Sequence, residues 1–186
     1  FNLSDSSISG SNRIYYNAIS SNTIMQLDLM PPMQIDSIIH YSMQCKFKRD
    51  GSAYFVELPA EQLIGVTNEV LVYFHGKPLV AKMPPWDGGV VWTKDDMGNP
   101  WVSIACQGMA AQVWFPNKDH MADEPENVIM HYTVPSDLVA VSNGRLKKIM
   151  AHKDGTSTYT WKVVNPINNY CMIPYIGKYS NAHDTI

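Results

Sequence analysis

The residue types that most often do chemistry in enzymes are scattered along this chain. No two histidines stand four residues apart around a glutamate, so the HExxH zinc helix is missing, and no His-x-His pair occurs. The stretch HMADE at 120–124 joins a histidine to two acids, but its prolines and aspartate favour a turn with side-chain caps. The six histidines are His40, His75, His120, His131, His152 and His183.

The cysteines and paired carboxylates give equally weak signals. Cys45, Cys106 and Cys171 are far apart and odd in number, which fits neither a disulfide framework nor a CxxC zinc site. We expect them to be buried free thiols. Asp95-Asp96 and Asp123-Glu124 are carboxylate pairs of the kind glycosidases use, yet adjacent acids are common in turns. The residues alone therefore assign no catalytic group and no metal ligand.

Aromatic and turn residues are concentrated between positions 84 and 125. Four of the five tryptophans lie in this stretch, and two interpretations are open. The rings can fill the space between sheets while each indole N–H donates to a backbone carbonyl, or they can form a platform for sugars. We favour the first, in which these residues are scaffold: Trp86, Trp92, Trp101 and Trp114.

Bulk composition indicates a globular protein and excludes several partners. The chain has 186 residues, is 45% hydrophobic and carries 14 basic against 17 acidic residues, a net charge of −3. No basic cluster exceeds the pair Lys147-Lys148, so we expect no nucleic acid as a partner. No window approaches 18 consecutive apolar residues, so we expect no membrane span.

The elements that must position these residues are predicted to be strands. Apolar residues alternate in several β-branched and aromatic runs, and no dozen residues keep a 3.6-residue period. Asp50-Gly51, Asn143-Gly144 and Asp154-Gly155 each lie between such runs and predict three β-hairpins. We predict an all-β fold with more than one sheet, and an ending at SNAHDTI that leaves the domain. Expected strands cover 11–19, 23–30, 34–41, 69–76, 89–93, 100–106, 111–115, 127–134 and 169–177.

The stretch 84–125 closely resembles the N-terminal domain of the M1 family of zinc aminopeptidases, in the bacterial branch related to leukotriene A4 hydrolase. Supporting segments follow in the family's order at 27–38, 133–146 and 159–179. The resemblance implies a single β domain over 1–186, a saddle-like assembly with a large mixed sheet and smaller antiparallel sheets. It implies that the partner is the parent's own catalytic domain, which would hold the zinc, and that this chain alone has no catalysis and no cofactor.

The resemblance also implies one contribution to the active site. In the family, a loop of this domain reaches the cleft and binds the N-terminus of the peptide substrate. The matching residues here are Cys106, Gln107 and Gly108, with Gln107 at the key position and Ala105 where relatives often carry glutamine. A glutamine carbonyl can accept a hydrogen bond from the substrate's ammonium group without the charge of a glutamate. Gly108 is expected to allow close approach of backbone and ligand.

Two rival functions remain open at this point. One is a non-catalytic β-sandwich binding module for carbohydrate or protein; the other is a parent that keeps the fold but has lost its zinc site. The family occurs in the cytoplasm and as exported bacterial proteins, so localisation is unknown. An apolar face that would meet the catalytic domain leads us to expect self-association of the chain alone.

Overall fold

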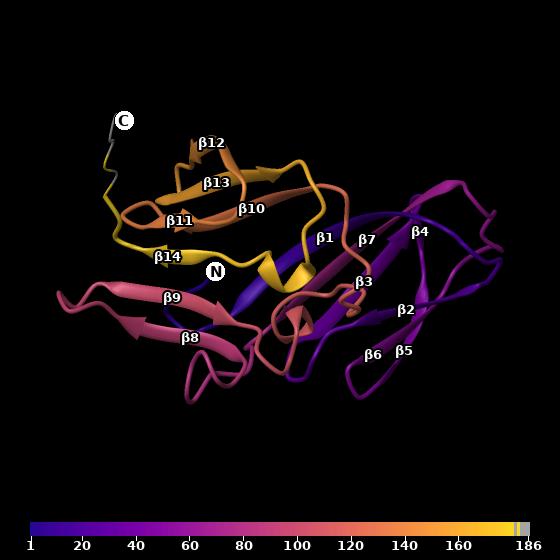
Figure 1. Cartoon of the computed structure of the whole chain (residues 1–186), viewed down its shortest axis with the longest axis horizontal. Coiled ribbons are helices and arrows are strands. Elements are labelled where there is room, and N and C mark those ends of the chain that lie inside the picture. The colour runs from indigo at the N-terminus through magenta and orange to yellow at the C-terminus, as the bar shows by residue number, and fades with distance from the viewer. Residues whose placement is uncertain (181, 183–186) are drawn as a thin grey trace.

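The computed structural model describes residues 1–180 and 182, so His183 and most of the expected exit segment SNAHDTI lie outside the described residues. Within them the chain forms fourteen strands and two short 3₁₀ helices. The strands gather into four sheets, two built from the first half of the chain and two from the second. Figure 1 shows the two pairs of sheets at opposite ends of an elongated molecule.

The first half of the chain supplies a four-stranded and a three-stranded sheet. The four-stranded sheet has the order β1-β7-β3-β4, with β1 (Ile8–Asn17), β7 (Thr67–Gly76), β3 (Gln34–His40) and β4 (Met43–Gln44). The three-stranded sheet has the order β2-β6-β5, with β2 (Ile24–Asp28), β6 (Ala53–Glu57) and β5 (Lys46–Asp50). Along β7 the predicted alternation is observed, because Val70, Val72 and Phe74 are buried and their neighbours are more exposed.

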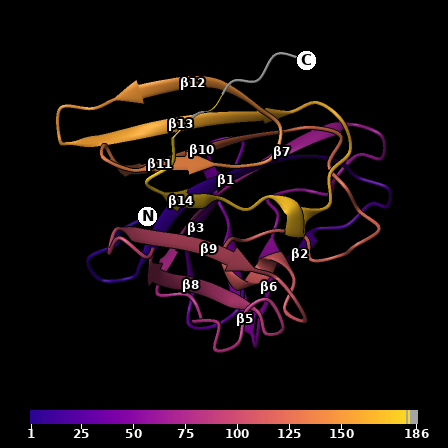
Figure 2. The same ribbon diagram turned by 60° about the vertical axis from the view of Figure 1, so that its left-hand side comes forward.

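The second half supplies the sheets that carry the candidate site. One has the order β11-β14-β9-β8, with β11 (Val139–Val141), β14 (Tyr175–Gly177), β9 (Pro100–Ala105) and β8 (Gly89–Lys94). The other has the order β10-β13-β12, with β10 (Val128–Pro135), β13 (Thr156–Val163) and β12 (Arg145–Ala151). The 3₁₀ helices are η1 (Ala111–Val113) and η2 (Asn169–Cys171). Figure 2 shows β12 at the outer margin of its sheet.

The all-β prediction is confirmed, with several antiparallel sheets. Every pair of neighbouring strands in the four sheets is antiparallel. Parallel pairing in the described part of the chain is limited to two isolated bridges, Ala18 with Ile64 and Val80 with Val90. The expected large mixed sheet is therefore divided into smaller antiparallel ones.

Two of the three predicted hairpins are confirmed, and one is wrong. β5 and β6 are joined through Gly51 and Ser52, because Asp50 already pairs with Ala53. β12 and β13 are joined by a three-residue loop that ends in Gly155, whose φ of 82° fits the left-handed position of such loops. The Asn143-Gly144 dipeptide instead carries the chain from one sheet to another, since β11 pairs with β14 and β12 with β13.

The strand expected over 111–115 is also wrong. The chain forms η1 there, because the two amides of Met109 and Ala110 both donate to the Cys106 carbonyl and close a tight turn. Ala110 then has a φ of 53°, which breaks any extended run into η1. The apolar residues Ala111 and Val113 are still buried. The apolar pattern of 111–115 therefore predicted the burial of these side chains correctly, but it predicted the wrong backbone conformation.

The tryptophans divide between scaffold and surface. Trp114 is buried and packs within 6.4 Å of the rings of Phe1 and Tyr132, and Trp92 packs against the same Phe1. The scaffold interpretation is wrong for Trp86, which is 79% exposed on a loop. The indole of Trp101 donates to the Tyr179 hydroxyl at 2.8 Å rather than to a backbone carbonyl. Because a sugar platform needs several exposed rings, these positions do not build one.

Candidate functional site

The tip that holds Gln107 follows an inner strand of the sheet. β9 ends at Ala105, which pairs with Gly89 of β8, and the chain then turns at Cys106. The Cys106 carbonyl accepts from the Met109 amide at 3.1 Å and from the Ala110 amide at 2.8 Å. Gln107 is exposed at the crest of this turn, and its side chain makes no hydrogen bond to the described residues. The turn therefore presents a free amide on a rigid base.

Gly108 serves the turn in a different way from the one expected. Its φ is 69°, a left-handed conformation that other residues adopt only with strain. A β-carbon at this position would meet no atom within 4 Å. The chain therefore uses glycine here for its backbone angle, and the expected role in close approach stays a prediction.

Gly88 is a contributor that the sequence analysis did not single out. It is buried, and a β-carbon on it would lie 2.8 Å from the Gln107 carbonyl oxygen and 2.9 Å from Cβ of Met109. The preceding loop is held by the Asp87 carboxylate, which accepts from the amides of Lys82 and Met83 at 2.6 Å each. The Gly88 backbone thus supports the tip from behind, and the Gly-Gly pair before an expected strand was the available signal.

Cys106 lies at the base of the tip as a half-buried thiol. Burial, and to a smaller extent the neighbouring Cys171 and Asp119, raise the pKa of this thiol to about 12. At neutral pH the thiolate that would be a nucleophile is therefore scarce. All three cysteines are free, as predicted, although Cys45 alone is fully buried. Cys106 is a packing residue in this arrangement.

Acidic side chains lie near two of the thiols, Cys106 and Cys171. Burial raises the pKa of the Asp119 carboxyl, while a hydrogen bond from Gln112 in η1 opposes that shift. Burial also raises the pKa of the Cys171 thiol, with a smaller contribution from Glu124. Asp119 and Glu124 thus lie close enough to act on the two thiols, and their negative charge favours a cationic ligand nearby.

The antiparallel order of the sheet β11-β14-β9-β8 brings distant segments together at one end of its strands. Since each strand runs opposite to its neighbour, this end holds the last residues of β9 and β11 and the first residues of β14 and β8. Asn143, just after β11, donates from its side chain to the Cys171 carbonyl, and η2 contacts η1. A hollow of about 440 Å³ lies beside them. It is lined by Val141, Ser142, Asn143, Tyr170, Cys171, Ile173 and Tyr175.

The loop after the tip is fastened to the first half of the chain. The Met30 amide donates to the Gln112 carbonyl at 2.8 Å, and the Asp119 amide donates to Asp28 Oδ2 at 3.2 Å. Asn169 of η2 donates to Asn117 Oδ1 at 2.8 Å. The first two bonds join the two halves of the chain, so the position of the loop depends on the whole fold.

The segment HMADE forms the predicted turn. The Asp123 amide donates to the His120 carbonyl at 3.1 Å, and the Ala122 amide donates to His120 Nδ1 at 3.2 Å. Asp123 also pairs with Lys118. His120 and Asp123 are therefore used for local structure.

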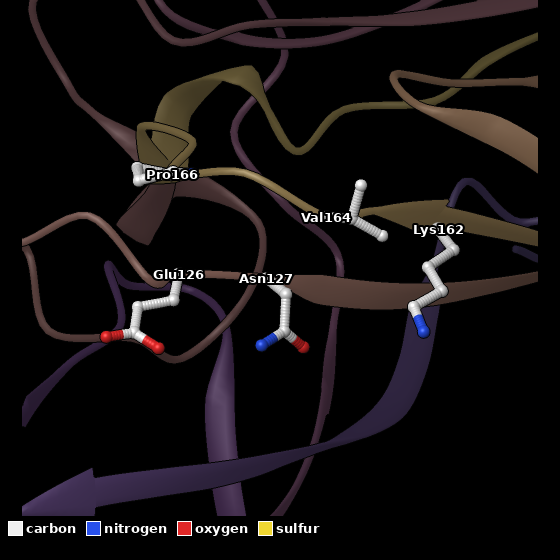
Figure 3. A pocket seen from close by; sticks show the side chains of 5 residues that line it. All are labelled: Glu126, Asn127, Lys162, Val164 and Pro166. Atoms are coloured by element: carbon white, nitrogen blue, oxygen red, sulfur yellow. The ribbon is translucent and has the colours of Figure 1, made fainter.

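A second hollow lies away from the tip. It measures about 580 Å³ and is lined by Glu126, Asn127, Lys162, Val164 and Pro166 (Figure 3). The side chains of Glu126, Asn127 and Lys162 project to the same side of the ribbon in this view. Gln107 lines neither of these two hollows.

Metal-binding groups were also sought. Among residues 1–180 and 182, no three histidine, cysteine, aspartate or glutamate side chains converge in a way that could hold a metal ion. The residues described do not fit a zinc site, and no chemistry through zinc can be derived from them. No helix in the same part of the chain is long and apolar enough to cross a membrane.

Comparison with known proteins gives a match at the level of structure. No family model and no curated protein matches the chain. An M1 zinc metallopeptidase from Deinococcus radiodurans superposes with a TM-score of 0.75 at 19% identity, over 91% of this chain and 37% of that one. A two-domain M1 zinc metallopeptidase mutant bound to L-arginine gives 0.77 at 19% identity, over 92% and 38%. Native yeast LTA4 hydrolase gives 0.73 at 16% identity, over 98% and 28%.

These matches cover nearly all of this chain but little more than a third of the metallopeptidases. At identities below 20% these matches show the fold alone. It is the fold that the resemblance of 84–125 and its supporting segments implied. The chain has the all-β fold of the N-terminal domain of M1 zinc metallopeptidases.

Proposed function

We propose that this chain is the N-terminal domain of a zinc-dependent aminopeptidase, which removes N-terminal residues from peptides. The observation that carries the proposal is the free amide of Gln107, presented on a turn at the end of an inner strand. The fold match supports it, because the neighbouring structures are M1 zinc metallopeptidases. The catalytic domain of the parent would be the partner of this domain, and a peptide would be the substrate.

In this proposal the chain contributes position and polarity. The Gln107 carbonyl accepts a hydrogen bond from the α-ammonium group of the peptide, and its amide N–H₂ remains free to donate. The carbonyl carries no formal charge, so the electrostatic attraction would come from Asp119, which acts on the Cys106 thiol at the base of the tip. Zinc would belong to the catalytic domain, and residues 1–186 would supply no catalytic group.

The test is substitution of Gln107 in the full-length parent. Gln107→Ala removes a hydrogen bond to a charged group, so kcat/KM on aminoacyl substrates is expected to fall about 10- to 150-fold. Gln107→Glu restores an acceptor and should recover most of the loss. Gln44→Ala is the matched control, because Gln44 is also exposed but lies on β4. Unchanged kcat/KM in Gln107→Ala would refute the role of the tip.

The two rival functions make different predictions. A parent without a zinc site would lack the HExxH helix and the G-x-M-E-N motif of the catalytic domain, which reading the parent's sequence decides at once. A carbohydrate-binding module would need stacked rings, and Trp86 is the one tryptophan of the aromatic stretch that is mostly exposed. Titration of the chain with oligosaccharides while Trp86 fluorescence is followed separates that function from the proposed one.

A further inference from the structure

Strand β12 is unusual among the longer strands because every residue of it is exposed. All seven residues from Arg145 to Ala151 are exposed. It pairs with β13 on one side only and forms the end of the sheet β10-β13-β12. Its other edge therefore offers unpaired backbone N–H and C=O groups to an added strand.

The hairpin that contains β12 carries an excess of positive charge. Residues 144–163 hold five basic residues and one acid, Asp154, which gives a net charge of +4. The whole chain has a net charge of −3, so the remainder carries −7. None of the ion pairs between described residues involves these five residues. They are Arg145, Lys147, Lys148, Lys153 and Lys162.

One face of β12 is apolar although residues 1–180 and 182 leave it about half exposed. Leu146 lies opposite Trp161 and Ile149 lies opposite Tyr159 in the register with β13. Trp161 and Tyr159 point inward, since they donate to the backbone carbonyls of Ala140 and Leu138. Leu146 and Ile149 therefore lie on the same inward face. Even so they are 42% and 54% exposed.

Edge protection alone does not account for this strand. Lysines and bulges commonly guard sheet edges, and β12 has both, with a register shift between Leu146 and Lys148. β5 shows what a guarded edge looks like in the same molecule, since it ends its sheet and exposes Lys46 and Lys48. The apolar residue between them, Phe47, packs against the core. A guarded edge has no need of exposed leucine and isoleucine.

We propose that β12 is a docking edge for an extended acidic segment of another polypeptide, which adds to the sheet as a further antiparallel strand, the pairing that the other strands of this sheet already have. Such a segment would alternate acidic with apolar residues. Its acids would meet Arg145 and Lys148 on the outer face, and its apolar residues would continue the row begun by Leu146 and Ile149. A second copy of this chain is disfavoured at the same edge, because pairing β12 with itself sets like charges opposite each other.

The experiment measures binding of a fluorescent ten-residue peptide of alternating glutamate and valine to the full chain by anisotropy. Two further peptides carry backbone N-methyl groups on all glutamates or on all valines. Successive N–H groups of a strand point to opposite sides, so one methylated peptide must lose binding and the other must keep it. A heparin fragment serves as a polyanion without a peptide backbone.

Charge reversal locates the site. The double variant Arg145→Glu, Lys148→Glu should weaken binding of the alternating peptide about tenfold. The matched control Lys46→Glu, Lys48→Glu on β5 should leave it unchanged. Equal binding of both methylated peptides, or heparin binding that the β12 variant removes to the same degree, would show a plain cationic surface and overturn the proposal. The methylated peptides are measured with the wild-type chain, so their result does not depend on whether the charge-reversal variants fold.

Discussion

Gly88→Ala tests whether the tip is held from behind. The new β-carbon would lie 2.8 Å from the Gln107 carbonyl oxygen, whereas ordinary contact begins at 3.4 Å, so one of them must retreat by 3.4 − 2.8 = 0.6 Å. Neither segment can move easily. The two hydrogen bonds to the Cys106 carbonyl hold the turn that contains Gln107, and the Asp87 carboxylate holds the loop that precedes Gly88. Overpacking of this kind typically destabilises a protein by about 1–3 kcal/mol.

The matched control is Gly10→Ala in β1. A β-carbon there meets only the Phe74 ring, at 3.4 Å, which is ordinary contact. Replacing glycine also removes freedom from the unfolded chain, which stabilises by about 0.4–1 kcal/mol where the backbone permits it. Gly10→Ala should therefore be neutral or slightly stabilising, while Gly88→Ala is destabilised.

Urea unfolding at 25 °C measures both variants, and thermal unfolding provides a second reading. For a chain of this length each kcal/mol shifts Tm by about 2–4 °C, so Gly88→Ala should lose roughly 2–12 °C. In the full-length parent, Gly88→Ala should also lower kcat/KM more than Gly10→Ala does, since it displaces Gln107. Equal stability of the two variants would refute the support that we assign to Gly88.

Two further predictions follow from burial. Leu29→Ala removes a side chain with no exposed surface and should lower the free energy of unfolding by about 2–5 kcal/mol. The control Ile19→Ala changes a side chain that is 90% exposed and should alter that free energy by less than about 0.5 kcal/mol. Equal free energies of unfolding for the two variants in urea would contradict this packing. Burial raises the pKa of the Cys106 thiol from 9.0 to about 12, so the native state keeps a proton that the unfolded state releases, and stability should fall as pH rises from 9 to 12. Cys106→Ala should flatten that fall, which urea unfolding at pH 8 and pH 10.5 checks.

Much of the local structure follows from neighbouring residues. The hairpin loops at Gly51 and Gly155 depend on backbone angles that glycine adopts without strain, so short motifs were sufficient to predict them. The alternation of Val70, Val72 and Phe74 reflects the two-residue period of a half-buried strand. Both signals are contained within a few residues, and both are confirmed.

The errors arose where the same local signal allows several partners. Asn143-Gly144 has the residues of a hairpin, but β12 pairs with the strand that follows it, and β11 pairs with β14 more than thirty residues on. The run 111–115 is apolar enough for a strand, yet the turn at Cys106 forces it into η1. Trp86 is as apolar as Trp114, and its loop alone leaves it exposed.

By itself the sequence determined the all-β class and two hairpins; the substrate contact at Cys106, Gln107 and Gly108 that it also indicated stays a prediction. Turn chemistry, alternation and family resemblance are properties of residue order, so they can be read without coordinates. Only the tertiary structure decided that Gly88 supports the tip, that Asn143 and Cys171 lie at the same end of the sheet as the tip, and that every residue of β12 is exposed. These facts depend on which strands pair across long stretches of chain, and sheet pairing is decided by the packing of the whole domain.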